Sequence, residues 1–334
     1  MAAPLKISII IHVEDSYDWT EDNNKAVGLY SLAHHVGTPG DSGVAGRNAK
    51  LSVQFGRNFI DSNGGNTYPL GAGVPTVLRA ILSYGGNFWT HTHASDYANL
   101  VSNYSCVRSA FQNEGGAGIF SAGGPGGRSG GWESGGPDWV SITQQAGIRI
   151  MNSTAMGAHA LVPLSARPYG ITDEEIEKLH PKAPAPGPFY TDVMTMRQRP
   201  FWMEVASNWF AGANTIYPSY VSSVLMIPAP GKLDVTPLSE GRGPSSNTSF
   251  SDDDLKCAFT QAWSTLQNKA YQDTIPNVWY THLPIADVNL ANIGLMGNFV
   301  DSLNNLFGIG GMTPDAEWMN MNEIASTFAN YTLW

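Results

Sequence analysis

Apolar and polar positions follow two different periods along the first hundred residues. Three short runs are dense in β-branched or aromatic residues, and they lie at 6–13, 50–55 and 87–93. The first run is nearly continuous, which is typical of a strand buried on both faces of a parallel sheet. Between the runs, apolar residues recur at helical spacing over 26–36 and 74–84. Strand and helix therefore alternate, which predicts a parallel sheet with right-handed crossovers.

The same patterns continue through the rest of the chain. Further strands are predicted at 147–151, 224–228 and 277–282. Further helices are predicted at 138–146, 172–179, 251–270, 294–307 and 321–331. The segment 113–138 is dense in glycine pairs and is interpreted either as a long binding loop or as an irregular surface excursion. Because no break in composition divides the chain, we predict a single domain over residues 1–334.

Composition narrows the classes of partner. Only 14 % of the residues are charged and the net charge is −10, with no basic run, which argues against nucleic acid or anionic lipid as a partner. No apolar run approaches the ~20 residues of a membrane helix, so no membrane insertion is expected. A low charge with 36 glycines suits an extracellular, glycan-active protein. The expected location is secreted or cell-envelope, as a mature form without a signal peptide, with a cytoplasmic location as the alternative.

Two cysteines are too few for a disulfide framework. Cys106 and Cys257 are expected to be two buried thiols, and a single bridge between them is the alternative.

Two imidazoles and a carboxylate fall within six residues at the end of the third apolar run. Side chains at positions i and i+2 of a strand project to the same side, so His91 and His93 can reach one metal ion. Asp96 adds an oxygen ligand. The alternative interpretation is that the histidines only satisfy polar groups at the end of a strand.

Polar residues also follow the first strand and end a late one. Glu14 and Asp15 come directly after the first apolar run, and His282 ends the strand predicted at 277–282. Parallel α/β folds place their active sites at the carboxyl ends of the strands. A solvated turn is the alternative for the acidic pair.

Together, Glu14-Asp15, the segment 85–93 and His282 resemble the NodB-homology polysaccharide deacetylase family, over most of the chain. The resemblance implies a distorted (β/α) barrel of the polysaccharide deacetylase type, with parallel strands, long loops at its C-terminal mouth and a divalent metal there. The family's first motif is Thr-Phe-Asp-Asp-Gly and its second is His-Ser/Thr-x-x-His. This chain departs from them with Glu14 for the first Asp, Ser16 for the Gly and Ser95 for the second His.

The resemblance also implies roles for single residues. Asp15 and His91, with His93 or Asp96 as the third ligand, would hold a divalent metal, for which zinc is the expected ion. Glu14 falls at the position of the general base, and His282 falls near the histidine that assists the leaving group. Residues expected to contact the sugar are Trp19, Arg128, Trp132, Arg199 and Trp202, with Trp89 as a further stacking candidate. For each tryptophan a place in the core is the alternative, and for any single one it is the commoner case.

The resemblance predicts a metal-dependent carbohydrate hydrolase that removes N- or O-linked acetyl groups from a polysaccharide or oligosaccharide. Two other classes stay open. One is a metal-independent glycoside hydrolase or lyase on a similar barrel, which would use carboxylates such as Glu14, Glu133 or Glu204. The other is a non-catalytic glycan-binding protein.

Overall fold

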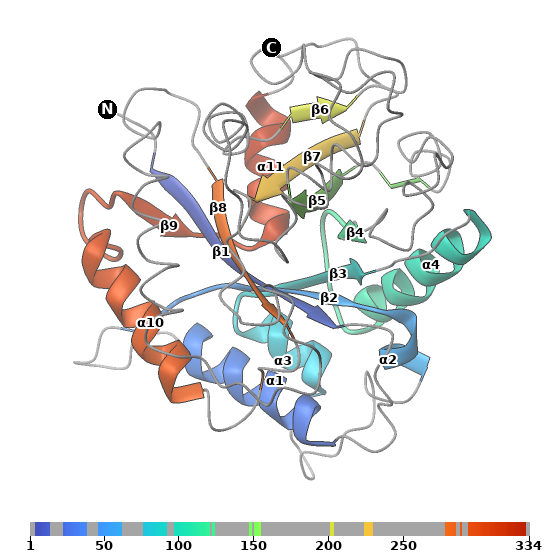
Figure 1. The fold of residues 1–334 in the computed structure, drawn as a ribbon, viewed down its shortest axis with the longest axis horizontal. Helices are drawn as coiled ribbons and strands as arrows, with labels where there is room; N and C mark the ends of the chain where they lie inside the picture. Colours follow the sequence, from blue (N-terminus) through green and yellow to red (C-terminus); the bar gives the residue numbers. More distant parts are fainter. Residues whose placement is uncertain are drawn as a thin grey trace, which may run out of the picture.

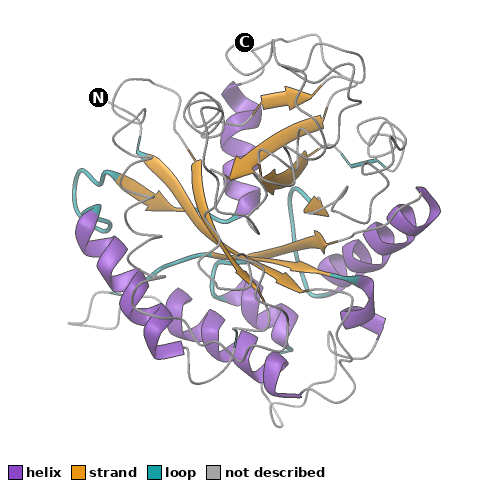
Figure 2. Cartoon of the chain, in the orientation of Figure 1, coloured by secondary structure: helices purple, strands orange, loops and turns teal. Residues whose placement is uncertain are grey.

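A curved sheet with helices packed against it forms the frame of the molecule (Figures 1 and 2). This computed structural model describes residues 4–13, 23–38, 46–61, 76–91, 97–120, 122–123, 147–148, 150–154, 201–203, 224–229, 278–284, 288 and 293–331. The strands are β1 (Leu5–Val13), β2 (Leu51–Phe55), β3 (Asn87–His91), β4 (Ala122–Gly123), β5 (Ile150–Thr154), β6 (Phe201–Met203), β7 (Val224–Ala229), β8 (Val278–Pro284) and β9 (Ala316–Trp318). The helices are α1 (Asn23–Gly37), α2 (Arg57–Asp61), α3 (Val77–Ser83), α4 (Tyr97–Asn113), α10 (Ile293–Leu306) and α11 (Met321–Tyr331).

The strand order is β6-β7-β5-β4-β3-β2-β1-β8, and β9 also pairs with β1. All pairs are parallel except that of the edge strand β6 with β7. Cα atoms of β7 and β8, which are far apart in this order, come within 8 Å of each other, so the sheet curls toward closure. The parallel sheet predicted from the alternation of strands and helices is confirmed.

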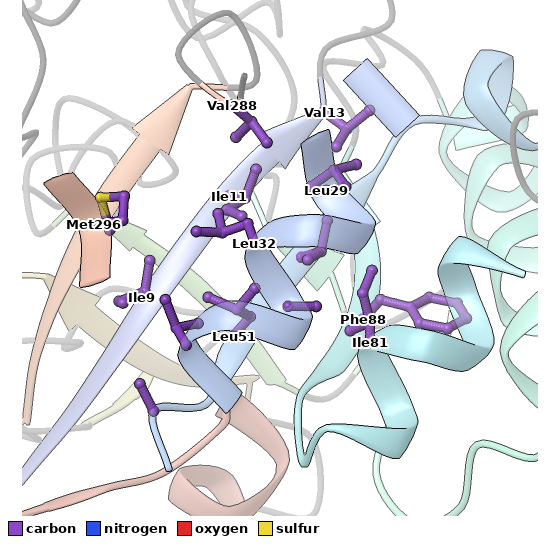
Figure 3. Close-up of a cluster of buried hydrophobic side chains, with 14 of the residues drawn as sticks. Ile9, Ile11, Val13, Leu29, Leu32, Leu51, Ile81, Phe88, Val288 and Met296 are labelled. Atoms are coloured by element: carbon purple, nitrogen blue, oxygen red, sulfur yellow. The ribbon is translucent and has the colours of Figure 1, made fainter. Parts of the chain in front are cut away.

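The outer face of the sheet carries the larger core. Every second residue of β1, namely Leu5, Ile7, Ile9, Ile11 and Val13, is buried there. These side chains pack with Leu51, Val53 and Phe55 of β2 and with apolar residues of α1, α3 and α10 (Figure 3). Burying a side chain of this size contributes about 1.5–3 kcal/mol. The alternation along β1 therefore decides which side the helices cover.

Helix α3 shows how local sequence fixes the entry to β3. Thr76 caps its start by accepting a hydrogen bond from the Arg79 amide at 3.1 Å. At the other end, Gly85 has φ +78°, and a Cβ on Gly86 would lie 2.8 Å from the Leu51 carbonyl oxygen. The glycine pair ends the helix because a left-handed residue and a close backbone approach are both needed there.

The inner face carries a second core and receives α11. Its residues Ile10, Trp89, Ile150 and Ile227 come from four different strands. They meet because the sheet is curved, and Met321, Ile324 and Ala325 of α11 pack on them. In Figure 1, α11 accordingly lies away from α1, α3 and α10.

Most elements predicted from local patterns are found. The runs at 6–13, 50–55, 224–228 and 277–282 are strands, and 26–36, 74–84, 294–307 and 321–331 contain helices. The strand predicted at 147–151 is shifted, since β5 runs over Ile150–Thr154 and Gly147 turns with φ +82°. Helices α2 and α4 and strands β4, β6 and β9 were not among the predicted elements. The helices predicted at 138–146, 172–179 and 251–270 lie outside the described residues, as does most of 113–138.

Arg47, which lies outside both helices, contacts one side chain of α1 and one of α10. Arg47 donates to both carboxylate oxygens of Asp301 at 2.9 Å, and its Nη1 lies 3.0 Å from His35 Nε2. Because a guanidinium only donates, His35 Nε2 accepts, so the ring is neutral in this contact. A Cβ on Gly297 would lie 2.5 Å from His35 Nε2, so only glycine leaves room for this pair.

This contact makes folding sensitive to pH. Burial lowers the pKa of His35, Arg47 lowers it further, and Asp301 opposes both. The unfolded chain therefore binds a proton first as the pH falls through the ordinary histidine range. We expect the free energy of unfolding to fall below about pH 6.5 and to level off once the folded ring is charged. Urea titrations from pH 8 to 5 should show a smaller fall in His35→Gln than in wild type; parallel curves for the two proteins would contradict it.

Candidate active site at the carboxyl edge of the sheet

Three neighbouring strands end at the same level on one edge of the sheet, the carboxyl edge. Val13 at the end of β1 is in register with Phe55 of β2, which is in register with Thr90 of β3. Strand β3 runs one residue further, to His91. Adjacent strands lie about 4.8 Å apart, so the chain leaves β1 and β3 roughly 10 Å apart across β2. Residues 14 and 15 follow β1 directly.

His91 is held by a strand that is buried from end to end. The alternation of β3 places Phe88 in the outer core and Asn87, Trp89 and His91 on the inner face. Only 1 % of His91 is exposed. A buried imidazole at a strand's carboxyl end is suited to ligation or proton transfer, because its environment is fixed by the strand.

The inner face of β1, β2 and β3 is unusually polar for a core, and Gln54 and His91 lie toward its carboxyl end. Ser8, Ser52, Gln54, Asn87 and His91 are all buried on it. Ser52 Oγ donates to Asn87 Oδ1 at 2.8 Å and lies 3.3 Å from Ser8 Oγ. Polar side chains in a protein interior are retained when they are hydrogen-bonded, and such networks fix the geometry of the strands that carry them.

Beside the site, polar side chains of α2 and α4 contact one another where the chain leaves β2. The Gly56 amide donates to the Val13 carbonyl at 3.1 Å, so β1 and β2 stay paired up to the last residue of β1. Arg57 then donates to Asp61 at 2.7 Å and to the Ser102 hydroxyl. Cys106, a half-buried free thiol, donates to Asp61 at 3.6 Å, and burial followed by Asp61 raises the pKa of the thiol. Cys257 lies outside the described residues.

The structure describes four of the predicted site residues, namely His91, His282, Trp202 and Trp89. His91 ends β3, His282 lies in β8 in register with Ile10, and Trp202 lies in the edge strand β6 in register with Leu225. Strand β8 continues for two residues beyond His282, which the sequence had suggested as its last. The others lie outside the described residues: Glu14, Asp15, Trp19, His93, Asp96, Arg128, Trp132 and Arg199, and also Glu133 and Glu204 of the metal-independent alternative.

The predicted metal ligands, which are imidazoles and carboxylates, fit a zinc ion chemically. Of these ligands, the structure describes His91. Among the described residues, no three His, Cys, Asp or Glu side chains gather as a metal-binding group. His91 supplies a buried imidazole, and β1, two strands away, leads directly into the carboxylates of Glu14 and Asp15. Imidazole with carboxylate is a donor combination used by catalytic zinc sites.

Of the two interpretations of Trp89, stacking on a sugar or a place in the core, the structure shows the second. The Trp89 side chain is 1 % exposed and packs in the inner core, and its Nε1 donates to Asn322 Oδ1 at 2.6 Å. Asn87, Trp89 and His91 follow one another at intervals of two residues, so their side chains lie on the same face of β3. The strand period that places His91 on the inner face therefore places Trp89 there as well.

Sequence patterns did not single out Asn322. It lies at the start of α11, 235 positions after Asn87, to which it is hydrogen-bonded at 3.2 Å. A contact over that separation leaves no local signal.

The part of the chain that the structure describes holds no helix long and apolar enough to cross a membrane.

Comparison with known proteins identifies the fold. No family model and no curated protein matches the sequence. A probable polysaccharide deacetylase from Pseudomonas aeruginosa PAO1 matches in structure with a TM-score of 0.53 and 12 % identity, over 99 % of this chain and 93 % of that one. Puue allantoinase matches with a TM-score of 0.52 and 12 % identity, over 99 % and 92 %. The chain therefore has the distorted (β/α) barrel fold of the polysaccharide deacetylase type, as its sequence predicts.

Proposed function

We propose that this protein is a metal-dependent hydrolase that removes N- or O-linked acetyl groups from a polysaccharide or oligosaccharide. One observation carries the proposal: His91 is a buried imidazole at the carboxyl edge, two strands from the exit of β1 into Glu14-Asp15. Active sites of (β/α) barrels lie at this edge. The likeness in fold to a probable polysaccharide deacetylase supports the substrate class. A glycan substrate also suits the secreted or cell-envelope location expected from composition.

The residues that would hold the metal are Asp15 and His91, with His93 or Asp96 as a third ligand. Zinc is the expected ion because imidazole and carboxylate are its common ligands in open, catalytic sites. When bound, such an ion supplies a Lewis acid for the acetyl carbonyl and lowers the pKa of a water molecule.

The chain's own residues would move the protons. Glu14 takes a proton from the attacking water, whose oxygen bonds to the acetyl carbon. As the bond from that carbon to nitrogen or oxygen breaks, His282 gives a proton to the departing amine or alcohol. The products are acetate and the deacetylated sugar. Trp19, Arg128, Trp132, Arg199 and Trp202 are the proposed sugar contacts.

Elemental analysis tests the proposal most directly. First-row metals per chain should be counted in chelator-free wild type and in His91→Ala. We expect close to one zinc per wild-type chain and its loss in His91→Ala, because removing one of three protein ligands leaves an incomplete site. Acetate release from acetylated oligosaccharides should fall in parallel.

His34→Ala is the matched control. His34 is an exposed imidazole on α1 whose ring contacts Tyr84, so its removal should leave the zinc content unchanged. Circular dichroism should show that His91→Ala remains folded. If wild type holds no metal even after reconstitution, the metal-dependent mechanism fails, and a metal-independent glycoside hydrolase or lyase, or a glycan-binding protein, takes its place.

A further inference from the structure

The turn into α11 contacts β3 at every second residue on the approach to His91. Asn320 Nδ2 donates to the carbonyl of Gly85, before the strand, at 2.9 Å. Asn322 Oδ1 accepts from Asn87 Nδ2 at 3.2 Å and from Trp89 Nε1 at 2.6 Å. His91 is the next position in this alternation. The contacts therefore follow one face of β3 up to the candidate site.

The directions of the hydrogen bonds around Asn322 are fixed by the indole of Trp89, which can only donate. An indole N–H can donate a hydrogen bond but cannot accept one, so Asn322 must present its oxygen to Trp89. That same oxygen then requires the amide nitrogen of Asn87, which leaves Asn87 Oδ1 to accept from Ser52 Oγ at 2.8 Å and from the Met321 amide at 3.3 Å. No alternative orientation of Asn322 satisfies both donors.

The network is buried and anchored on both sides. Trp89, Asn87 and Ser52 are each at most 2 % exposed, so an unmatched donor among them would be costly. Asn320 and Glu323 cap the start of α11 reciprocally, with bonds of 2.9 and 3.0 Å. Lys50, directly before β2, pairs with Glu323. Helix α11 is thus fixed to the sheet where it touches β3.

We propose that Asn322 is a positioning residue for His91. By holding the indole of Trp89 and the amide of Asn87, it fixes the rotation of the inner face of β3, and with it the direction in which the His91 ring leaves the strand. The first turn of α11 thereby sets the geometry of a metal ligand through the side chains that precede it on the inner face of β3. This inference rests on the proposed function, in which His91 is a ligand.

Asn322→Leu removes the shared acceptor while keeping a side chain of similar size. Zinc affinity, measured by competition with a chromophoric chelator, is expected to weaken at least about tenfold, as for other supporting residues of metal sites. The ring proton signals of His91 in metal-free protein, assigned with His91→Gln, should shift. Asn322→Asp retains an oxygen for both donors and should restore the affinity and the ring signals.

Ser326→Ala is the matched control, because Ser326 is exposed one turn later on α11 and bonds only to the Asn322 carbonyl among the contacts described. It should change neither readout. If Asn322→Leu does not fold, Trp89→Phe removes the indole donor while keeping an aromatic ring, and it should shift the same signals.

The two hypotheses fail separately. If wild type binds no zinc, the proposed function fails, and the His91 ring signals alone decide the positioning role. The role of Asn322 is overturned if Asn322→Leu moves the Trp89 indole signal yet leaves the His91 signals, and the zinc affinity where zinc binds, at wild-type values.

Discussion

Replacing Phe88 by alanine should lower the free energy of unfolding by about 3–5 kcal/mol. Phe88 is fully buried at the centre of a row of rings on the outer face of the sheet. Its centroid lies 5.5 Å from that of Phe55 and 5.2 Å from that of Phe111, both edge to face. Alanine would leave a cavity between β2, β3 and α4 that backbone anchored in a sheet cannot close. Urea denaturation gives the difference.

Two variants make the expected loss specific. Phe88→Leu keeps most of the apolar volume and should cost clearly less than alanine. Phe120→Ala removes a half-buried ring at the end of the same row, 5.3 Å from Phe111, and should also cost less. A loss below about 1 kcal/mol for Phe88→Ala would contradict the view that this row fixes α4 to the sheet.

The elements recovered from sequence are those whose signals are local. A few consecutive residues are enough to predict β1, from its nearly continuous apolar run, and the end of α3, from the glycine pair that follows it. Helix α10 has a clear apolar face, with Met296, Phe299, Val300 and Leu303 all buried. Such patterns survive folding because tertiary contacts only reinforce them.

Helix α4 was missed although its buried positions have helical spacing. Leu100, Tyr104, Val107 and Phe111 are buried along one side. The residues between them are largely Asn, Ser and Arg, which favour caps and solvent and dilute the apolar signal. Strand β9 carries no signal at all, because its three residues become a strand only by pairing with Leu5–Ile7 of β1, over 300 positions earlier.

The residues at and near the candidate site also differ in whether local sequence could predict them. His91 at a strand end could be predicted because residues and strand are contiguous. The network behind it joins Ser52, Asn87 and Asn322, three residues of ordinary appearance that meet only after the sheet has formed and α11 has docked. A candidate ligand at a strand end is therefore easier to predict from sequence than the buried residues that pack beside it.

Replacing Glu14 by glutamine should remove most of the activity while the metal stays bound. If Glu14 is the general base, turnover of an acetylated oligosaccharide should fall by about 10²- to 10⁴-fold, because the amide cannot take the proton of the attacking water. Zinc content should stay at the wild-type level, since Asp15 and His91 are the proposed ligands. Asp15→Asn, the neighbouring acid, should lose both the metal and the activity.

The paired variants separate the classes of function. In a metal-independent glycoside hydrolase or lyase, Glu14→Gln would also remove activity, but the activity would be glycosidic cleavage and would survive chelators. In a glycan-binding protein, wild type would release no acetate, and Glu14→Gln would bind the glycan as before. Retained zinc with lost acetate release in Glu14→Gln, together with lost zinc in Asp15→Asn, is expected only when the first acid moves a proton and the second holds the metal.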